Sequence, residues 1–327
     1  MTMDGRILGR VALYGVAYLT LGFILLPLIF VTWLAFFAQE IPSFPPEGYS
    51  VKWFGAIANN RNFVTGFWTS LQVAVAATVI GLLIAVPASL ILARRQFAGS
   101  AALSQFLLLP LVVPGVVMGT SIYVFQIETE IATGLPILGS LGGLVAGHTL
   151  LVIPWTVRLV TASLTGLDRA AEEAAQSLGA NQWTTFFRVT LPAIRPGIVA
   201  GALFGFVTSF GNLEMSLFLV GPGRITLPIA ILQYLEWKID PTVAAVSVLQ
   251  ILLIAVAMVR ASSWSWVTMT VVRPSCCCRA RISSRTSRRS LASRLDRGSS
   301  RSRTSGRMTR ARARATRCCW PPESWRG

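Results

Sequence analysis

The sequence has few of the residues that a water-soluble surface or a catalytic site requires. Only 13% of its 327 residues are charged, whereas 53% are hydrophobic, and the mean hydropathy is +0.62. It contains one histidine and two lysines, Lys52 and Lys238, and neither lysine follows a glycine. The phosphate-binding loop G-x-x-x-x-G-K-[ST] is therefore absent, and nucleophilic or metal catalysis lacks its usual residues. This composition argues against an enzyme and indicates a membrane protein.

The net charge of +16 is concentrated at one end of the chain. Residues 1–260 hold 13 basic and 11 acidic residues, whereas residues 261–327 hold 16 and 2. All five cysteines also lie in this second segment: Cys276, Cys277, Cys278, Cys318 and Cys319. The first 260 residues therefore have no disulfide framework and need an interpretation separate from that of the tail.

Six long stretches with little charge predict six transmembrane helices and an all-α integral membrane protein. Each is long enough for the roughly 20 residues that a spanning helix needs, and too long for the strands of a barrel. The stretches lie between Arg10 and Glu40, Arg61 and Arg94, Gln96 and Ile127, Ile131 and Val157, Pro196 and about Val220, and Pro241 and Val259.

The distribution of arginine and lysine in the short loops predicts the orientation. If residues 1–10 are cytoplasmic, eight basic residues lie in inner segments and four in outer loops, which favours cytoplasmic N- and C-termini. The inner set is Arg6, Arg10, Arg94, Arg95, Arg158, Arg169, Arg188 and Arg195, and the outer set is Lys52, Arg61, Arg224 and Lys238.

The predicted cytoplasmic loop from Arg158 to Ile194 is too long for a simple connection. Helix formers follow Asp168, a suitable N-cap, and continue to Leu178, while Gly179 is a suitable residue to end the helix. Leu167, Ala171, Ala174, Ala175 and Leu178 fall on one face at helical spacing. We expect a second short helix between Asn181 and Pro192 that presents Trp183, Phe186 and Phe187. Together these features predict a docking element.

The loop also carries a spaced pattern that resembles the membrane subunits of ATP-binding cassette (ABC) importers. The pattern is Glu-Ala-Ala, three residues, glycine, nine residues, an aliphatic residue, any residue, and Leu-Pro. It is met in full by Glu173, Ala174, Ala175, Gly179, Val189, Leu191 and Pro192. The resemblance extends over about residues 10–260 and is closest to the spermidine/putrescine permease subfamily, with weaker support from Leu109–Gly115, Ser209-Phe210 and Gly221–Pro228.

This resemblance implies a type I importer permease fold, with a transmembrane domain over residues 11–260 and a coupling loop at about 163–193. The coupling helix of such permeases inserts into a cleft of the ATPase subunit, which assigns that role to Glu173, Ala174, Ala175 and Gly179, with Leu191 and Pro192 completing the motif. The implied partners are a second permease, two ATP-binding subunits, an extracytoplasmic solute-binding protein and membrane lipid. ATP and magnesium would bind the partner ATPase, so this chain would be no enzyme and would bind no cofactor or metal.

Glu214 is the main candidate for the solute pathway, because an ionisable group in a spanning segment usually faces a bundle interior or a water-filled cavity. We expect it in the outer half of the fifth helix, with Asn212 and Ser209 lining the same cavity. The alternatives are a carboxylate in water at the membrane interface or one that pairs with a neighbouring subunit. A cationic polyamine is the leading solute. Because related permeases have an acidic pair where this chain has Gly211-Asn212, opines, phosphonates or other small solutes stay open, as does a passive channel or scaffold. His148 is expected to be a hydrogen-bonded core residue.

The segment 261–327 departs from the family pattern. One interpretation is a basic arm that binds RNA or anionic lipid. However, it has arginine without lysine and no metal-ligand spacing among its cysteines. We therefore favour a frameshift near residue 260, which would yield a disordered tail, and expect no nucleic-acid partner.

Overall fold

The computed structural model describes residues 3–95 and 97–261, which are almost entirely helical. Its longer helices are α1 (Met3–Leu34), α3 (Arg61–Arg94), α5 (Gly115–Thr133), α6 (Leu141–Thr165), α9 (Leu191–Phe210) and a last helix, Thr242–Ala261. The shorter ones are α2 (Lys52–Asn59), α4 (Ser100–Leu108), η1 (Leu109–Leu111), α7 (Arg169–Ser177), α8 (Gln182–Thr185), η2 (Phe186–Thr190), α10 (Leu213–Leu219) and α11 (Leu227–Trp237). The tail from residue 262, on which the RNA, lipid and frameshift interpretations rest, lies outside the described residues.

The predicted membrane helices are present, with one of them broken. Five helices in the described part of the chain are long and apolar enough to cross a membrane, and a bent pair makes a sixth. This pair is Ser100–Leu111 and Gly115–Thr133, with an angle of 103° between its halves. Pro114 explains the break, because it has no backbone N–H and disfavours a helical conformation in Val113.

Two predicted boundaries were wrong for local reasons. The fourth spanning helix begins at Leu141, not near Ile131, because Gly134 ends α5 in a left-handed conformation and Ser140 caps α6 by accepting a hydrogen bond from Gly143 N at 3.0 Å. The fifth ends at Phe210, because Gly211 leaves the helix and Asn212 starts α10.

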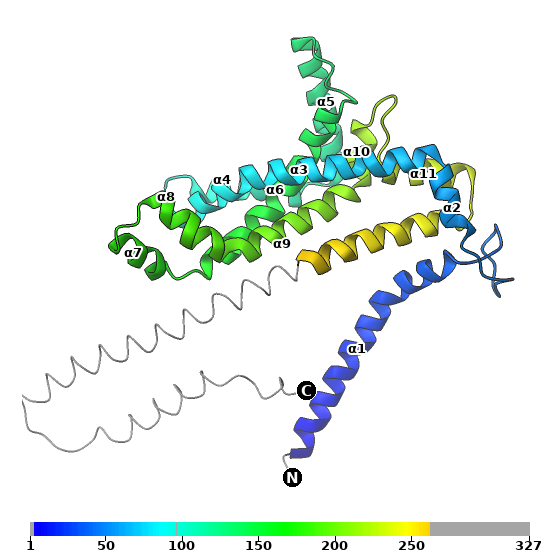
Figure 1. Cartoon of the computed structure of the whole chain (residues 1–327), viewed down its shortest axis with the longest axis horizontal. Helices are drawn as coiled ribbons and strands as arrows, with labels where there is room; N and C mark the ends of the chain where they lie inside the picture. The colour runs from blue at the N-terminus through cyan, green and yellow to red at the C-terminus, as the bar shows by residue number, and fades with distance from the viewer. Residues whose placement is uncertain (1–2, 96, 262–327) are drawn as a thin grey trace, which may run out of the picture. The chain divides into compact units, whose positions relative to one another are not determined.

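Helices α3, α6 and α9 pack side by side and form the core (Figure 1). Three glycines spaced four residues apart, Gly197, Gly201 and Gly205, line the face of α9 towards α6. A Cβ atom at Gly205 would lie 2.6 Å from Val152 Cγ1, and one at Gly201 would lie 3.1 Å from the Thr156 Cα. Small residues at such positions let helix backbones approach closely, which is the main source of packing energy between helices in a membrane.

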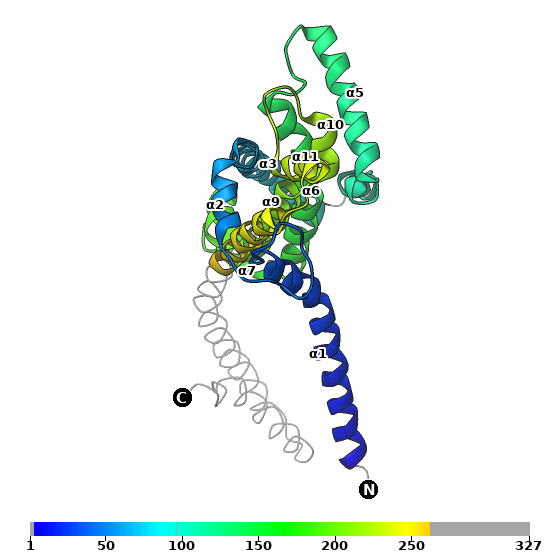
Figure 2. The same cartoon turned by 90° about the vertical axis from the view of Figure 1, so that its right-hand side faces the viewer.

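Among the residues of α1 whose burial is described, those that contact the core lie near its C-terminal end. Ala35 is buried there with Trp53 and the last helix, whereas every residue from Ala12 to Phe30 is exposed. Helix α5 likewise projects from the α3–α6–α9 core in both orientations (Figure 2). These apolar surfaces are left for lipid or another protein to cover.

The glycine spacing on α9 yields a stability prediction. Gly197→Val should lower the free energy of unfolding by about 1–3 kcal/mol, because a Cβ at Gly197 would lie 2.8 Å from the Leu159 carbonyl oxygen. The matched control is Gly22→Val in α1, where no atom lies within 4 Å of an added Cβ. Thermal denaturation in detergent measures both, and equal melting temperatures for the two variants would contradict the packing argument.

Candidate functional site

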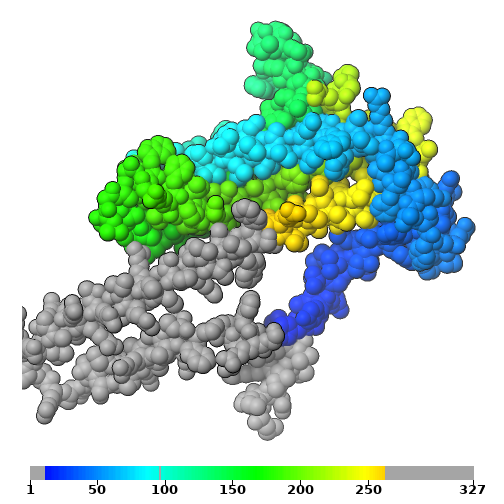
Figure 3. Space-filling view, viewed as in Figure 1, coloured from blue at the N-terminus to red at the C-terminus, as the bar shows by residue number. Residues whose placement is uncertain are grey.

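The coupling helix predicted in the cytoplasmic loop is α7, and its ends follow the local signals. The Asp168 side chain caps it by accepting a hydrogen bond from Ala170 N at 3.0 Å. After the helix, Gly179 takes a φ of +88°, a conformation that favours glycine. Figure 3 shows this region forming one end of the described chain. The predicted helix from Asp168 to Leu178 is thus confirmed.

The second predicted helix starts where expected but does not stop before Pro192. Asn181 caps α8 through its Oδ1, which accepts a hydrogen bond from Thr184 N at 2.7 Å. The chain then passes through a single π-helical segment, Phe186–Thr190, directly into α9. Leu191 and Pro192 occupy the first turn of α9, where a missing backbone N–H is tolerated. The loop is therefore continuous with a membrane helix.

Two adjacent glutamates on α7 face in different directions. Glu172 is buried, forms a salt bridge with Arg94 at the end of α3, and accepts a hydrogen bond from Thr190 Oγ1 in η2. Glu173, in contrast, is exposed. The sequence motif includes Glu173, but Glu172 was not among the predicted site residues. The available signal was helical spacing, since Glu172 lies three residues before Ala175, another position on the predicted inner face.

The outer surface of this region carries apolar side chains. Leu178 is 89% exposed, so the predicted apolar face of α7 is not wholly covered by this chain, although Ala174 and Ala175 are half-buried. Trp183 and Phe187 are also exposed, and their rings stack with centroids 6.4 Å apart. Exposed apolar side chains such as these are suited to a protein contact.

The predicted pathway residues lie around the break between α9 and α10. Ser209 is buried, and its Oγ lies 3.0 Å from Nδ1 of His148. Ser216 Oγ donates to the Asn212 carbonyl at 2.7 Å and lies 3.4 Å from His148 Nε2. His148 is thus a hydrogen-bonded core residue, as expected, and Ser209 belongs to this buried network instead of an open cavity.

Asn212 and Glu214 begin the short helix α10. The Asn212 Oδ1 accepts a hydrogen bond from Met215 N at 2.7 Å and so caps the helix. Glu214 was expected within the fifth spanning helix, but that helix ends before it, and the exposed side chain lies in the first turn of α10. This correction follows from Gly211 and Asn212, which favour a break and a cap.

The break before α5 and the break before α10 lie next to each other in the structure. The Glu214 carboxylate lies beside Gly115, the first residue of α5, and a Cβ atom at Gly119 would lie 2.6 Å from Phe218 Cδ2. The N-terminus of a helix carries unpaired N–H groups and a partial positive charge, which favours a carboxylate there. The arrangement places an exposed negative charge where two membrane segments are interrupted.

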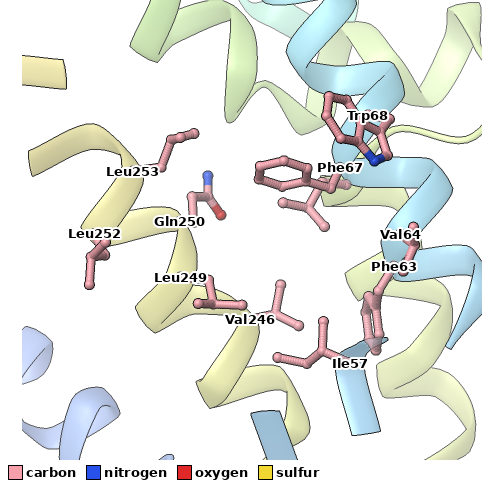
Figure 4. Close-up of a pocket in the computed structure, with 11 residues that line it drawn as sticks. Ile57, Phe63, Val64, Phe67, Trp68, Val246, Leu249, Gln250, Leu252 and Leu253 are labelled. Atoms are coloured by element: carbon pink, nitrogen blue, oxygen red, sulfur yellow. The ribbon is translucent and has the colours of Figure 1, made fainter. Parts of the chain in front are cut away.

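A separate apolar hollow of about 320 Å³ was not predicted. Figure 4 shows its lining from α2, α3 and the last helix, with Gln250 as a polar side chain among hydrophobic ones. Such a lining suits an apolar occupant. In the described residues no group of three or more histidine, cysteine, aspartate or glutamate side chains could hold a metal ion.

Comparison with known families and sequences gives consistent matches. Residues 78–262 match the family described as "Binding-protein-dependent transport system inner membrane component". The putrescine transport system permease protein PotI of Escherichia coli K12 is 29% identical over 218 residues, covering 66% of this chain and 77% of PotI. The spermidine/putrescine permease protein PotC of the same organism is 28% identical over 216 residues, covering 66% and 79%. The molybdenum transport system permease protein ModB of Mycobacterium bovis is 34% identical over 224 residues, covering 64% and 82%.

Solved structures show the same fold. A chain of a bacterial ABC transporter involved in alginate import superposes with a TM-score of 0.61 at 14% identity, covering 81% of this chain and 98% of that chain. A chain of the MetNI methionine ABC transporter gives a TM-score of 0.53 at 19% identity, covering 63% and 96%. The predicted type I importer permease fold is thus confirmed.

The end of α7 yields a second prediction. Gly179→Ala should destabilise the loop by about 1–2 kcal/mol, because a non-glycine residue is strained at positive φ, while Gly179→Asn should be tolerated better. Gly166→Ala is the matched control, since the φ of Gly166 is −81°. The measurement is the rate of tryptic cleavage at Arg169 and Arg188. Equal rates for Gly179→Ala and Gly166→Ala would show that the conformation of Gly179 is unimportant.

Proposed function

Because this chain belongs to the family of inner-membrane components of binding-protein-dependent transport systems, we propose that α7 couples it to a separate ATP-binding subunit. The chain would form half of the translocation pathway of an ATP-driven importer. The observation that carries this proposal is the capped helix α7, which exposes Glu173 and Leu178 at the end of the membrane bundle. Small alanines would let the helix seat closely in a cleft, and Glu173 would meet a basic residue.

ATP hydrolysis belongs to the partner in this proposal. With only two lysines, neither after a glycine, the chain cannot form a P-loop. ATP and magnesium would therefore bind the partner subunits, and this chain would bind neither.

The orientation follows from the position of the arginines around α7. Arg94 ends α3, Arg169 begins α7, and Arg188 lies in η2, so the bundle end that carries the proposed docking surface is rich in arginine, although it also holds the acidic residues of α7. Positive residues favour the cytoplasmic side. We therefore place this end, and both termini, in the cytoplasm, where an ATPase would be available.

The exposed surface of α1 and membership of the transport family support the other proposed partners. A second permease would complete the pathway, and the exposed apolar length of α1 from Ala12 to Phe30 supports a contact with it and with lipid. Two ATP-binding subunits would dock on the two permeases. An extracytoplasmic solute-binding protein would deliver the solute at the opposite end.

The solute we propose is a polyamine. PotI and PotC are named as putrescine and spermidine/putrescine permeases, and the exposed Glu214 carboxylate at the helix breaks would attract a cation. ModB is named for molybdenum transport, which keeps another small solute as an alternative. Glu214 would attract a cationic polyamine and repel a negatively charged solute. Its charge would therefore distinguish these two kinds of solute.

Docking is tested by co-purification of the solubilised permease with the ATPase encoded beside its gene. Glu173→Lys should weaken the association at least about ten-fold through like-charge repulsion with a basic partner, and Gly179→Pro should do so because proline cannot adopt positive φ. Glu128→Lys, which reverses an exposed charge on α5, is the control. If both loop variants kept the ATPase while remaining folded by size-exclusion chromatography, the docking assignment would be wrong.

The solute is tested by uptake of radiolabelled putrescine into proteoliposomes that contain the whole transporter. Glu214→Gln should reduce uptake several-fold without releasing the ATPase, because it removes the charge and nearly preserves the shape. Loss of the Glu214 charge beside the N-terminus of α5 should lower the free energy of unfolding by only about 0.3–1 kcal/mol. Unchanged uptake in Glu214→Gln, or an equal loss in Glu128→Gln, would contradict the role of Glu214.

A further inference from the structure

Helix α7 needs a mechanical connection to the membrane helices if its movement is to reach them. We propose that Glu172 is the positioning residue that locks α7 to the inner end of α3 and to the start of α9, so that the three move as one body. This inference rests on the proposed docking of α7. It concerns a residue that lies outside the docking surface.

The contacts of Glu172 join three segments that are distant in sequence. Its carboxylate pairs with the Arg94 guanidinium of α3 and accepts the hydroxyl of Thr190 in η2, which continues into α9. The residue is only 7% exposed. A single side chain thus links the loop helix to one spanning helix directly and to another through the π-helical segment.

The remaining contacts of α7 with α3 are weak. The backbone of α7 packs near α8 and η2, and the helix reaches α3 through long side chains. Besides Glu172, Arg169 Nη2 donates to the Ala93 carbonyl at 3.3 Å. The face of α7 beside Glu172 consists largely of alanines, which bury little apolar area. The ion pair is therefore the main side-chain link between α7 and α3.

Removal of the Glu172 charge should loosen this connection while leaving the helices intact. Glutamine keeps the shape and can still accept the Thr190 hydroxyl, but it leaves the partly buried Arg94 without a counter-charge. Glu173→Gln removes the same charge from the next residue, which points outward. The pair of variants separates internal fixation from docking.

The test measures the distance between spin labels on α7 and α3 in the full chain. Labels are placed at Ser177→Cys and at Ile91→Cys, both exposed, after the five tail cysteines are replaced by serine. Wild type and Glu173→Gln should give the same narrow distance distribution in the isolated permease. Glu172→Gln should broaden it about two-fold through local opening of the loop, and Thr190→Val should broaden it less.

The same labels are then measured in the complex with the ATPase, with and without trapping by ATP and vanadate. In wild type the distance should stay constant on trapping, whereas in Glu172→Gln it should shift, because α7 would follow the ATPase without α3. A narrow distribution in Glu172→Gln, or a trapping-dependent shift in wild type, would overturn the proposal. Failure of wild type to bind the ATPase would instead refute the proposed docking, and the measurement on the isolated permease would still decide the role of Glu172.

Discussion

The close approach of α6 and α9 is the constraint on which the rest of the structure depends. Gly197, Gly201 and Gly205 remove the side chains that would hold the two backbones apart, and in lipid such packing replaces the hydrophobic effect as the force between helices. With α3 packed on both, the result is a closely packed core, and Arg94 lies at one of its ends. A charged contact with Glu172 holds the loop helix α7 at this end of the core. In the proposed account, a force on α7 would therefore act on the whole core.

Two other membrane segments are interrupted instead of closely packed along their whole length. Pro114 breaks the pair α4–α5, and Gly211 with Asn212 separates α9 from α10. Interrupted helices in a membrane are tolerated where their backbone groups are satisfied or meet water. Here the Asn212 cap serves that purpose, and the Glu214 carboxylate lies beside the first residue of α5. In the proposed account, a closely packed core that contacts α7 and an interrupted region around Glu214 suit a protein that transmits movement to a solute pathway.

The sequence predicted features that depend on neighbouring residues and missed those that depend on distant ones. The cap at Asp168, the turn at Gly179 and the positions of most spanning helices follow from local chemistry. The contact between Glu172 and Arg94 joins residues 78 apart, so no local pattern could reveal it. The predicted helix end before Pro192 was wrong. Proline often marks the end of a helix, but it is also tolerated in the first turn of one. Glu214 was misplaced because an apolar run alone does not show where a helix breaks.

Photo-crosslinking from position 178 of the full chain in intact membranes tests the central claim most directly. Leu178 is the most exposed large hydrophobic side chain of the loop. It lies next to the left-handed turn that ends α7, so a crosslink formed there identifies the protein on which the loop docks. The account predicts a covalent adduct between a photoreactive residue at position 178 and an ATP-binding subunit, and none from the same residue placed at position 13 on α1. Adducts with lipid alone, or with no ATP-binding subunit, would contradict the assignment of α7 as the coupling helix.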